Sequence, residues 1–207
     1  RLGIARSRSS FTAEEGRIYT TEAVAAADGV GFMVEVEGCE GAEERVPSSG
    51  LLRLGGDGRG AEIAPWPGRE PAVGQAPAPG EPFALLLSTP GIFPDGWLPP
   101  GVEQGDGAVR LRVEGLSARL AAAAVPRPQV VSGWNLAAHA PKPAQRAAPA
   151  GAVYLFDQVD GDPASYPSAL WPEVQRRLGD SGWDTTWMQR RAEGFNNVLV
   201  GRWPHTS

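Results

Sequence analysis

Glycine (27) and proline (20) make up almost a quarter of the 207 residues, and this abundance constrains the fold more than any other feature. The two residues follow no regular period, so the chain is not collagen-like and should contain many turns and long loops. Apolar residues make up 42% and charged residues 21% of the chain, which is a globular composition. We therefore expect a packed core in one domain of ordinary size or in two small ones.

Patterns typical of β-strands dominate the chain. Alternating apolar and polar residues, or short apolar runs, predict strands at 17–24, 32–37, 83–88, 109–113, 152–156 and 198–203. Asp28-Gly29 lies between the first two runs and is typical of a hairpin turn. Residues 121–125 stay open between helix and strand, because alanine favours a helix but Pro126 ends the segment.

One helix is predicted. It begins at Ser168 or Trp171, has Pro172 near its first turn, where a missing N–H costs little, and ends at Gly179. The chain then divides into a strand-rich core at 1–59 and 83–125, a long Pro/Gly-rich loop at 60–82, an irregular loop at 126–150, and a closing strand–helix–strand segment at 151–207.

Charge is segregated along the chain, although its net value is only −5. Acids gather between residues 28 and 44, whereas residues 1–12 and 115–156 contain none. The two acid-free stretches include Arg1, Arg6, Arg8, Arg119, Arg127, Lys142 and Arg146. Phosphate contacts dominate non-specific nucleic-acid binding, so a net acidic chain is a poor non-specific binder. Segregation still permits a basic face; the alternative is that these cations only solvate loops.

Membrane, disulfide and metal features are absent from the sequence. No apolar run approaches the roughly 18–20 residues that a membrane helix needs. The single cysteine, Cys39, cannot form an internal disulfide, so a reducing, cytoplasmic compartment is expected. Two histidines and one cysteine do not supply the usual transition-metal clusters, and no cofactor is expected.

Two features could belong to an active site. Gly55-Gly56-Asp57-Gly58 resembles the GGD core of nucleotide cyclases and palm polymerases, but it lacks the further carboxylates that two metal ions need. A turn is the favoured interpretation, and Arg53 and Arg59 beside it could attract an anion. His139 is the only interior histidine, and therefore the only such candidate for the acid or base of a metal-independent ribonuclease.

Seven tryptophans stand out in a chain otherwise poor in aromatic residues. Trp66, Trp97, Trp134 and Trp203 adjoin proline or glycine, on predicted loops or strand ends. Large rings can close the ends of a small β core, or they can stack on unpaired bases. We favour core or interface positions for most of them. Trp134 is the exception, because its surroundings are basic and free of acids.

Nine segments, in order along the chain, resemble one family. They are LGIAR (2–6), TAEEGRIY (12–19), LRLGGDGR (52–59), LLLSTP (85–90), GWLP (96–99), VSGWNLA (131–137), PKP (141–143), RAAPAGAVYLF (146–156) and EGFNNVLVG (193–201). Together they are similar to the RAMP-superfamily subunit of the type III-B CRISPR (Cmr) effector complex, the member that binds the crRNA 5′ tag. Asn135 stands where the family usually has aspartate, and Asn196 where it has a glycine.

The resemblance implies an α+β fold of ferredoxin-like, RRM-like RAMP modules, strand-rich and with long Pro/Gly loops. By this resemblance the family's opening ferredoxin-like segment is missing here, so we expect residues 1–207 to be the C-terminal portion of such a protein. Its function would be a non-catalytic clamp on the crRNA 5′ tag in antiviral defence. Its partners would be the crRNA, the large polymerase-like subunit and a backbone RAMP subunit, with no membrane.

Three alternatives stay open. They are the corresponding subunit of a type III-A effector, a crRNA-processing RAMP endoribonuclease that uses His139, and a β domain that binds only protein. For the clamp we expect RNA in a groove formed by the N-terminal arginines, the acid-free stretch and the turn at 194–197. The expected RNA-binding residues are Arg6, Arg8, Arg53, Arg59, Arg127, Trp134, Asn135, Lys142, Arg146, Gly194, Phe195 and Asn196.

Overall fold

The chain forms two units, Arg1–Glu70 and Pro71–Ser207. The computed structural model describes residues 2–6, 9–10, 12–20, 27–34, 41, 45, 47–54, 59–66, 75–105, 107–135 and 139–203. The division between the units falls within the predicted loop at 60–82. Each unit has its own pattern of strand pairing.

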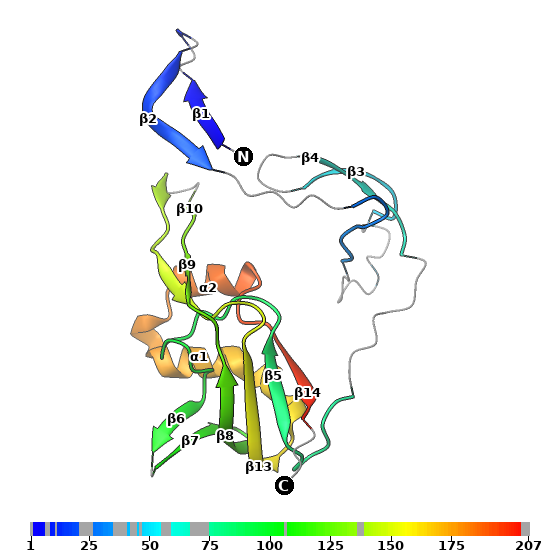
Figure 1. Ribbon diagram of the computed structural model, residues 1–207, viewed down its shortest axis with the longest axis vertical. Coiled ribbons are helices and arrows are strands. Elements are labelled where there is room, and N and C mark those ends of the chain that lie inside the picture. The colour runs from blue at the N-terminus through cyan, green and yellow to red at the C-terminus, as the bar shows by residue number, and fades with distance from the viewer. Residues whose placement is uncertain are drawn as a thin grey trace. The chain divides into compact units, whose positions relative to one another are not determined.

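The first unit contains two antiparallel strand pairs (Figure 1). Strand β1 (Leu2–Arg6) pairs with β2 (Ala13–Thr20), and β3 (Gly50–Leu54) pairs with β4 (Arg59–Ile63). The register places Leu54 opposite Arg59, so the strands on both sides of the glycine motif pair as in a hairpin. The motif itself, residues 55–58, lies outside the described residues.

The predicted turn and strand in the acidic region have different outcomes. Asp28-Gly29 does form a turn, because the Val30 N–H donates to the Ala27 carbonyl at 3.1 Å and Gly29 has φ 77°, but no strand of a hairpin follows it at 30–34. The predicted strand at 32–37 is wrong over residues 32–34, which form no strand and have exposed side chains. Alternation marks a strand only where a partner strand and a core face exist, and these residues have neither in the described structure.

The second unit is built on a six-stranded antiparallel sheet with the order β14-β5-β13-β8-β7-β6. Its strands are β5 (Phe83–Leu87), β6 (Val102–Gly105), β7 (Ala108–Val113), β8 (Leu116–Ala124), β13 (Val153–Gly161) and β14 (Val198–Arg202). The strands predicted at 83–88, 109–113, 152–156 and 198–203 are thereby confirmed. Residues 121–124, which the sequence left open, continue strand β8.

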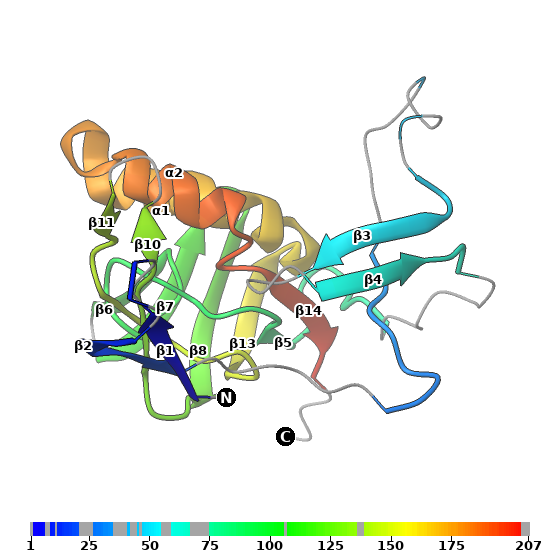
Figure 2. The same ribbon diagram turned by 90° about the horizontal axis from the view of Figure 1, so that it is seen from above.

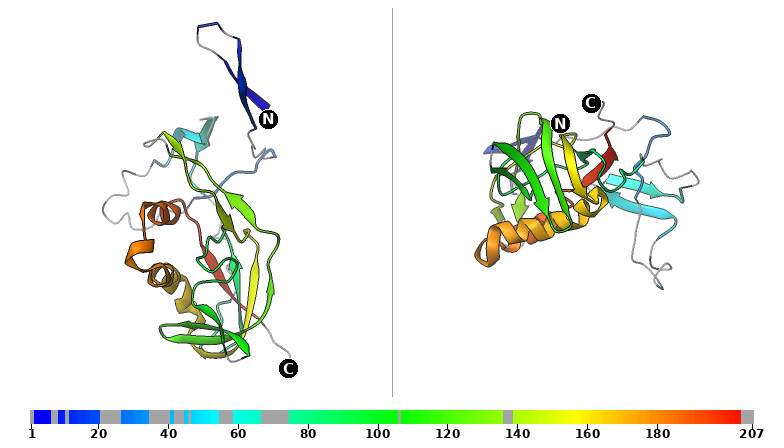
Figure 3. Two further views of the ribbon diagram at one scale, coloured as in Figure 1. Left: turned by 90° about the vertical axis from the view of Figure 1, so that its left-hand side faces the viewer. Right: turned by 90° about the horizontal axis from the view of Figure 1, so that it is seen from below.

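Two helices cover one face of this sheet, as Figures 2 and 3 show. They are α1 (Tyr166–Gly182), which follows the 3-10 helix η2 (Pro163–Ser165), and α2 (Thr185–Ala192). Tyr166, Leu170 and Val174 recur every four residues along α1 and are fully buried. They share one core with strand residues such as Phe83 and Phe156, whose rings stack 4.9 Å apart.

The helical region differs from the sequence prediction in two ways. Helix α1 begins at Tyr166, so Pro172 lies inside it and not near its first turn. Gly179 does interrupt the helix, with φ 66° and ψ 174°. Helix α2 was not predicted; the Asp184 side chain caps it by accepting hydrogen bonds from the N–H groups of Thr186 and Trp187. Neither helix is long and apolar enough to span a membrane.

The segment predicted as an irregular loop, 126–150, instead contains four short strands. They are β9 (Gln129–Val131), β10 (Trp134–Asn135), β11 (Ala140–Pro141) and β12 (Gln145–Ala147). Strand β9 pairs with β12, and β10 pairs with β11, so these strands continue the β8–β13 pair beyond the sheet (Figure 1). Residues 116–135 and 139–161 therefore form the two arms of one long β-hairpin, named here the extended hairpin.

Candidate functional site

Almost the whole extended hairpin is formed by the acid-free stretch of the sequence, residues 115–156. Its first carboxylate after Gly115 is Asp157, at the base of the hairpin. There Asp157 accepts a hydrogen bond from Arg119 Nε at 2.7 Å, and this pairing raises the pKa of Arg119. Arg119 therefore has a carboxylate partner inside the sheet. The other three cations of the stretch, Arg127, Lys142 and Arg146, lie beyond the sheet.

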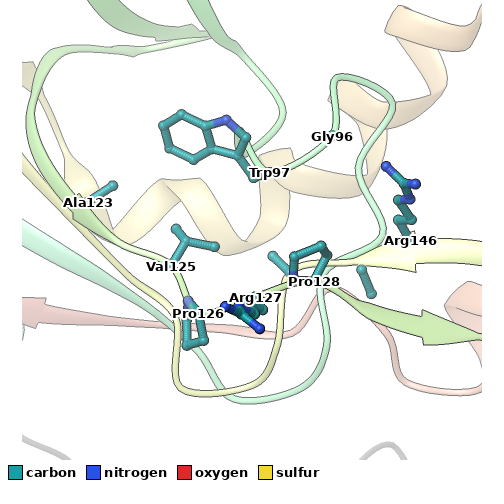
Figure 4. A pocket seen from close by; sticks show the side chains of 10 residues that line it. Gly96, Trp97, Ala123, Val125, Pro126, Arg127, Pro128 and Arg146 are labelled. Atoms are coloured by element: carbon teal, nitrogen blue, oxygen red, sulfur yellow. The ribbon is translucent and has the colours of Figure 1, made fainter.

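A pocket of about 580 Å³ lies where the hairpin leaves the sheet (Figure 4). It is lined by Gly96, Trp97, Ala123, Val125, Pro126, Arg127, Pro128, Arg146, Ala147 and Ala148. Two of the expected RNA-binding residues, Arg127 and Arg146, thus border one cavity although 18 residues separate them. The pairing of β9 with β12 brings their neighbourhoods together, because Val130 lies opposite Arg146.

The only charged side chains that line the pocket are the two arginines. Both arginine side chains are exposed, and neither forms an ion pair with any carboxylate in the described part of the chain. The lining contains no acidic side chain at all. Its remaining side chains are apolar, so the pocket combines an uncharged wall with two uncompensated positive charges at its border.

Trp97 borders the pocket, although the sequence analysis favoured a core or interface position for it and kept only Trp134 among the expected RNA-binding residues. Its ring stacks on Tyr154, with centroids 6.3 Å apart and planes inclined by 8°, yet 48% of Trp97 remains exposed. The Tyr154 hydroxyl donates to the Trp97 carbonyl at 2.5 Å, and burial raises the pKa of this tyrosine. The tryptophan is therefore anchored from one side and open to the pocket on the other. The position of Trp97 beside two arginines depends on pairings distant in sequence, which no local pattern reveals.

Lys142 lies in a second group, between the hairpin and helix α2. Its ammonium pairs with Glu193, which also accepts a hydrogen bond from Arg190 Nη1 at 2.9 Å. Arg190 is 2% exposed; its Nε donates to Gln145 at 2.9 Å, and its guanidinium lies 5.3 Å from the centre of the Phe195 ring. We call Lys142, Gln145, Arg190 and Glu193 the latch, because they fasten the hairpin to the helix.

Gly194 and Asn196 shape the turn that follows the latch. Both have left-handed backbone, with φ 81° and φ 64°, a conformation that glycine and asparagine adopt most readily. Asn196 is 2% exposed; its side chain accepts from the Ile92 N–H at 2.6 Å and donates to the Ile92 carbonyl at 3.1 Å. The Asn196 side chain is therefore engaged within the fold, and any role of this turn toward RNA would fall to its backbone and to Phe195.

The far end of the hairpin holds Trp134, Asn135 and His139. Trp134 is 56% exposed and lies opposite Pro141, and Asn135 lies opposite Ala140. His139 is exposed and has φ 48°. In the described part of the chain, no three His, Cys, Asp or Glu side chains lie close enough together to hold a metal ion.

For the expected RNA-binding residues of the first unit, the structure gives mainly the strand on which each residue lies. Arg53 is exposed on β3. Arg6 ends β1 and Arg59 begins β4, while Arg8 lies outside the described residues. The single groove expected from the sequence therefore stays a prediction. Within the second unit the expected residues lie in three places: at the pocket, at the latch with the turn that follows it, and at the far end of the hairpin.

Glu193 should make the stability of the chain depend on pH. The hydrogen bond from Lys142 lowers its pKa below the ordinary value of 4.5, burial opposes this shift, and Arg190 lowers the pKa further. Stabilisation by a group with a lowered folded-state pKa is complete above its unfolded-state pKa and is lost as the pH falls through the folded-state pKa. Between about pH 5 and pH 3 the wild-type chain should thus lose more unfolding free energy than Glu193→Gln, measured by urea titration. Parallel losses in the two proteins would contradict this assignment.

The comparison with known proteins agrees with the sequence resemblance. No curated protein matches the chain. The family model of the CRISPR-associated protein (Cas_Cmr3) matches residues 1–203, which include the extended hairpin, the pocket and the latch. The chain therefore belongs to the Cas_Cmr3 family and is a subunit of the type III-B Cmr CRISPR effector.

Proposed function

We propose that this subunit is a non-catalytic clamp for the 5′ tag of the crRNA, with the extended hairpin as its principal RNA-binding element. The observation that carries the proposal is the placement of Arg127 and Arg146 at one acid-free pocket. Phosphate contacts supply most of the affinity of nucleic-acid binding, and arginine can pair with a phosphate while its plane stacks on a base. A net acidic protein can bind RNA where its cations are gathered in this way.

The strand order supports a ferredoxin-like second unit. In the proposed correspondence β5, β8, β13 and β14 are the four strands of a split β-α-β module, and their spatial order is β14-β5-β13-β8. Helices α1 and α2 occupy the connection before the last strand, and the β6–β7 pair replaces the helix before the second strand. The open face of the four strands carries Leu86, Leu155 and Leu199 but no aromatic ring from β5 or β14, which favours the hairpin over the sheet as the proposed RNA-binding surface.

The partners of this clamp would be the large polymerase-like subunit and the first backbone RAMP subunit, in the cytoplasm. The alternative function is an endoribonuclease that uses His139, and incubation with repeat RNA distinguishes it from the clamp. Cleavage of repeat RNA without metal, lost in His139→Ala, would overturn the clamp. RNA recovered intact from the co-purified complex, with a constant 5′ sequence, is the result that the clamp requires.

The double variant Arg127→Ala/Arg146→Ala should weaken binding of single-stranded RNA with that 5′ sequence. If each arginine contacts one phosphate, the plot of log affinity against log salt should become shallower by about two units. Fluorescence anisotropy at several salt concentrations measures both quantities. The matched control is Arg112→Ala/Arg191→Ala, which removes two exposed arginines elsewhere in the second unit and should bind as wild type. Equal affinity and slope in the pocket variant and the control would show that the RNA binds elsewhere.

A further inference from the structure

The pocket beside Trp97 has three kinds of wall, each suited to a different part of a nucleotide. An aromatic wall is formed by the exposed part of Trp97, which Tyr154 supports from behind. An apolar wall comes from the segment of Val125, Pro126 and Pro128 and from Ala123, which lies opposite Tyr154 in the sheet. Figure 4 shows that segment below Trp97, with Arg127 between Pro126 and Pro128 and Arg146 on the other side of Pro128.

We propose that this pocket receives one unstacked nucleobase of the bound RNA, with Trp97 as its stacking platform and Arg127 and Arg146 on the flanking phosphates. The inference rests on the proposed function that the chain binds single-stranded RNA. It adds the recognition of a single splayed base by a residue outside the acid-free stretch. Stacking on an aromatic ring tolerates any base, so the pocket selects for an unpaired nucleotide more than for its identity.

Rigidity and volume both favour this occupant. A pocket of about 580 Å³ lies within the range in which proteins enclose small organic groups. Pro126 and Pro128 restrict the backbone of one wall, and the hydrogen bond from Tyr154 fixes the backbone of Trp97. Little conformational entropy is therefore lost when a flat ring enters.

The charges favour a nucleotide over a peptide. An apolar side chain from a partner protein would use the walls but would leave two arginines uncompensated at the border of the pocket. An unpaired nucleotide presents an apolar face to the tryptophan and keeps its phosphates outside, where the guanidinium groups can reach them. An acidic peptide is the competing occupant, and the experiment below distinguishes the two.

The test uses two variants. Ala123→Leu adds bulk to the pocket lining without changing Trp97 or the arginines, and Trp97→Ala removes the stacking platform. The matched controls are Ala122→Leu, the neighbouring residue on the opposite face, and Trp66→Ala, an exposed tryptophan of the first unit. Each variant of the 207-residue chain is titrated with single-stranded RNA of the co-purified 5′ sequence and with the same RNA carrying one abasic ribose at each position in turn.

One abasic position should weaken wild-type binding by about 5- to 100-fold. Ala123→Leu and Trp97→Ala should show a loss of that size with intact RNA, no further loss with the abasic RNA, and an unchanged salt dependence. Wild-type affinity in Ala123→Leu, together with weak binding in Arg127→Ala/Arg146→Ala, would overturn the base pocket while leaving the RNA clamp standing. Wild-type affinity in all of these variants would overturn the clamp site as well. Binding of a decaglutamate peptide that is lost in Ala123→Leu, with RNA binding unchanged, would instead assign the pocket to an acidic protein.

Discussion

Gly161→Ala should lower the unfolding free energy of the chain by at least about 4 kcal/mol, a large part of the roughly 5–15 kcal/mol by which native proteins are stable. Gly161 ends strand β13 opposite Leu116, at φ 105°. A Cβ atom there would lie 2.0 Å from the Gly115 carbonyl oxygen and 2.9 Å from its carbon. Both are backbone atoms, so relief requires that β13 separate from the start of β8, at the base of the extended hairpin. Backbone strain at a positive φ adds about 1–3 kcal/mol.

Gly201→Ala is the matched control for this prediction. Gly201 also lies within a strand of the same sheet, opposite Ala84, but a Cβ atom there has no neighbour within 4 Å. Alanine should therefore be tolerated or slightly stabilising, because it restricts the unfolded chain. Urea unfolding followed by circular dichroism measures both variants. A Gly161→Ala protein as stable as Gly201→Ala would show that the close approach of the two backbones is not required for folding.

Most of the sheet was predictable because its strands are local patterns. In β5, Phe83, Leu85 and Leu87 are buried and alternate with less buried neighbours between two prolines. Helix α2 was not predictable in this way, since few of its residues are apolar and its only strong local signal is the cap at Asp184. Strands β9 to β12 of the extended hairpin could not be predicted for another reason. They are two or three residues long and lie among prolines, and only pairing across the hairpin identifies them.

The candidate site was predictable from charge and not from contacts. The lack of carboxylates between 115 and 156 pointed to Arg127 and Arg146, and the structure places both at one pocket. The lack of nearby carboxylates could not show that Lys142, unlike the two arginines, has an acidic partner. That partner, Glu193, lies 51 residues later in the chain. The same criterion could not reveal Trp97 either, because that residue reaches the pocket through its stacking on Tyr154. Acids and aromatic rings distant in sequence decide which cations of a basic stretch stay available.

The stability of the chain should respond very differently to the loss of Glu193 and to the loss of Arg190 from the latch. Glu193→Ala leaves Arg190, which is 2% exposed, with a hydrogen bond to Gln145 and the face of Phe195 as its remaining compensation. In the described part of the chain its Nη2 is already buried without a partner. An uncompensated buried charge costs about 3–5 kcal/mol, so we expect a loss of about 3 kcal/mol in unfolding free energy. Arg190→Met should cost less, because the released Glu193 keeps Lys142 and is 34% exposed.

The double variant Arg190→Met/Glu193→Ala decides the cause of that loss. If the cost of Glu193→Ala is the unpaired buried guanidinium, removing that group restores most of the stability, and the two changes are strongly non-additive. If Glu193 stabilises the chain mainly through Lys142, the losses simply add, and the double variant is the least stable of the three. Urea unfolding at pH 7 of the wild type and the three variants gives the coupling energy directly. A restored double variant would assign to Glu193 the compensation of a charge buried between helix α2 and the hairpin.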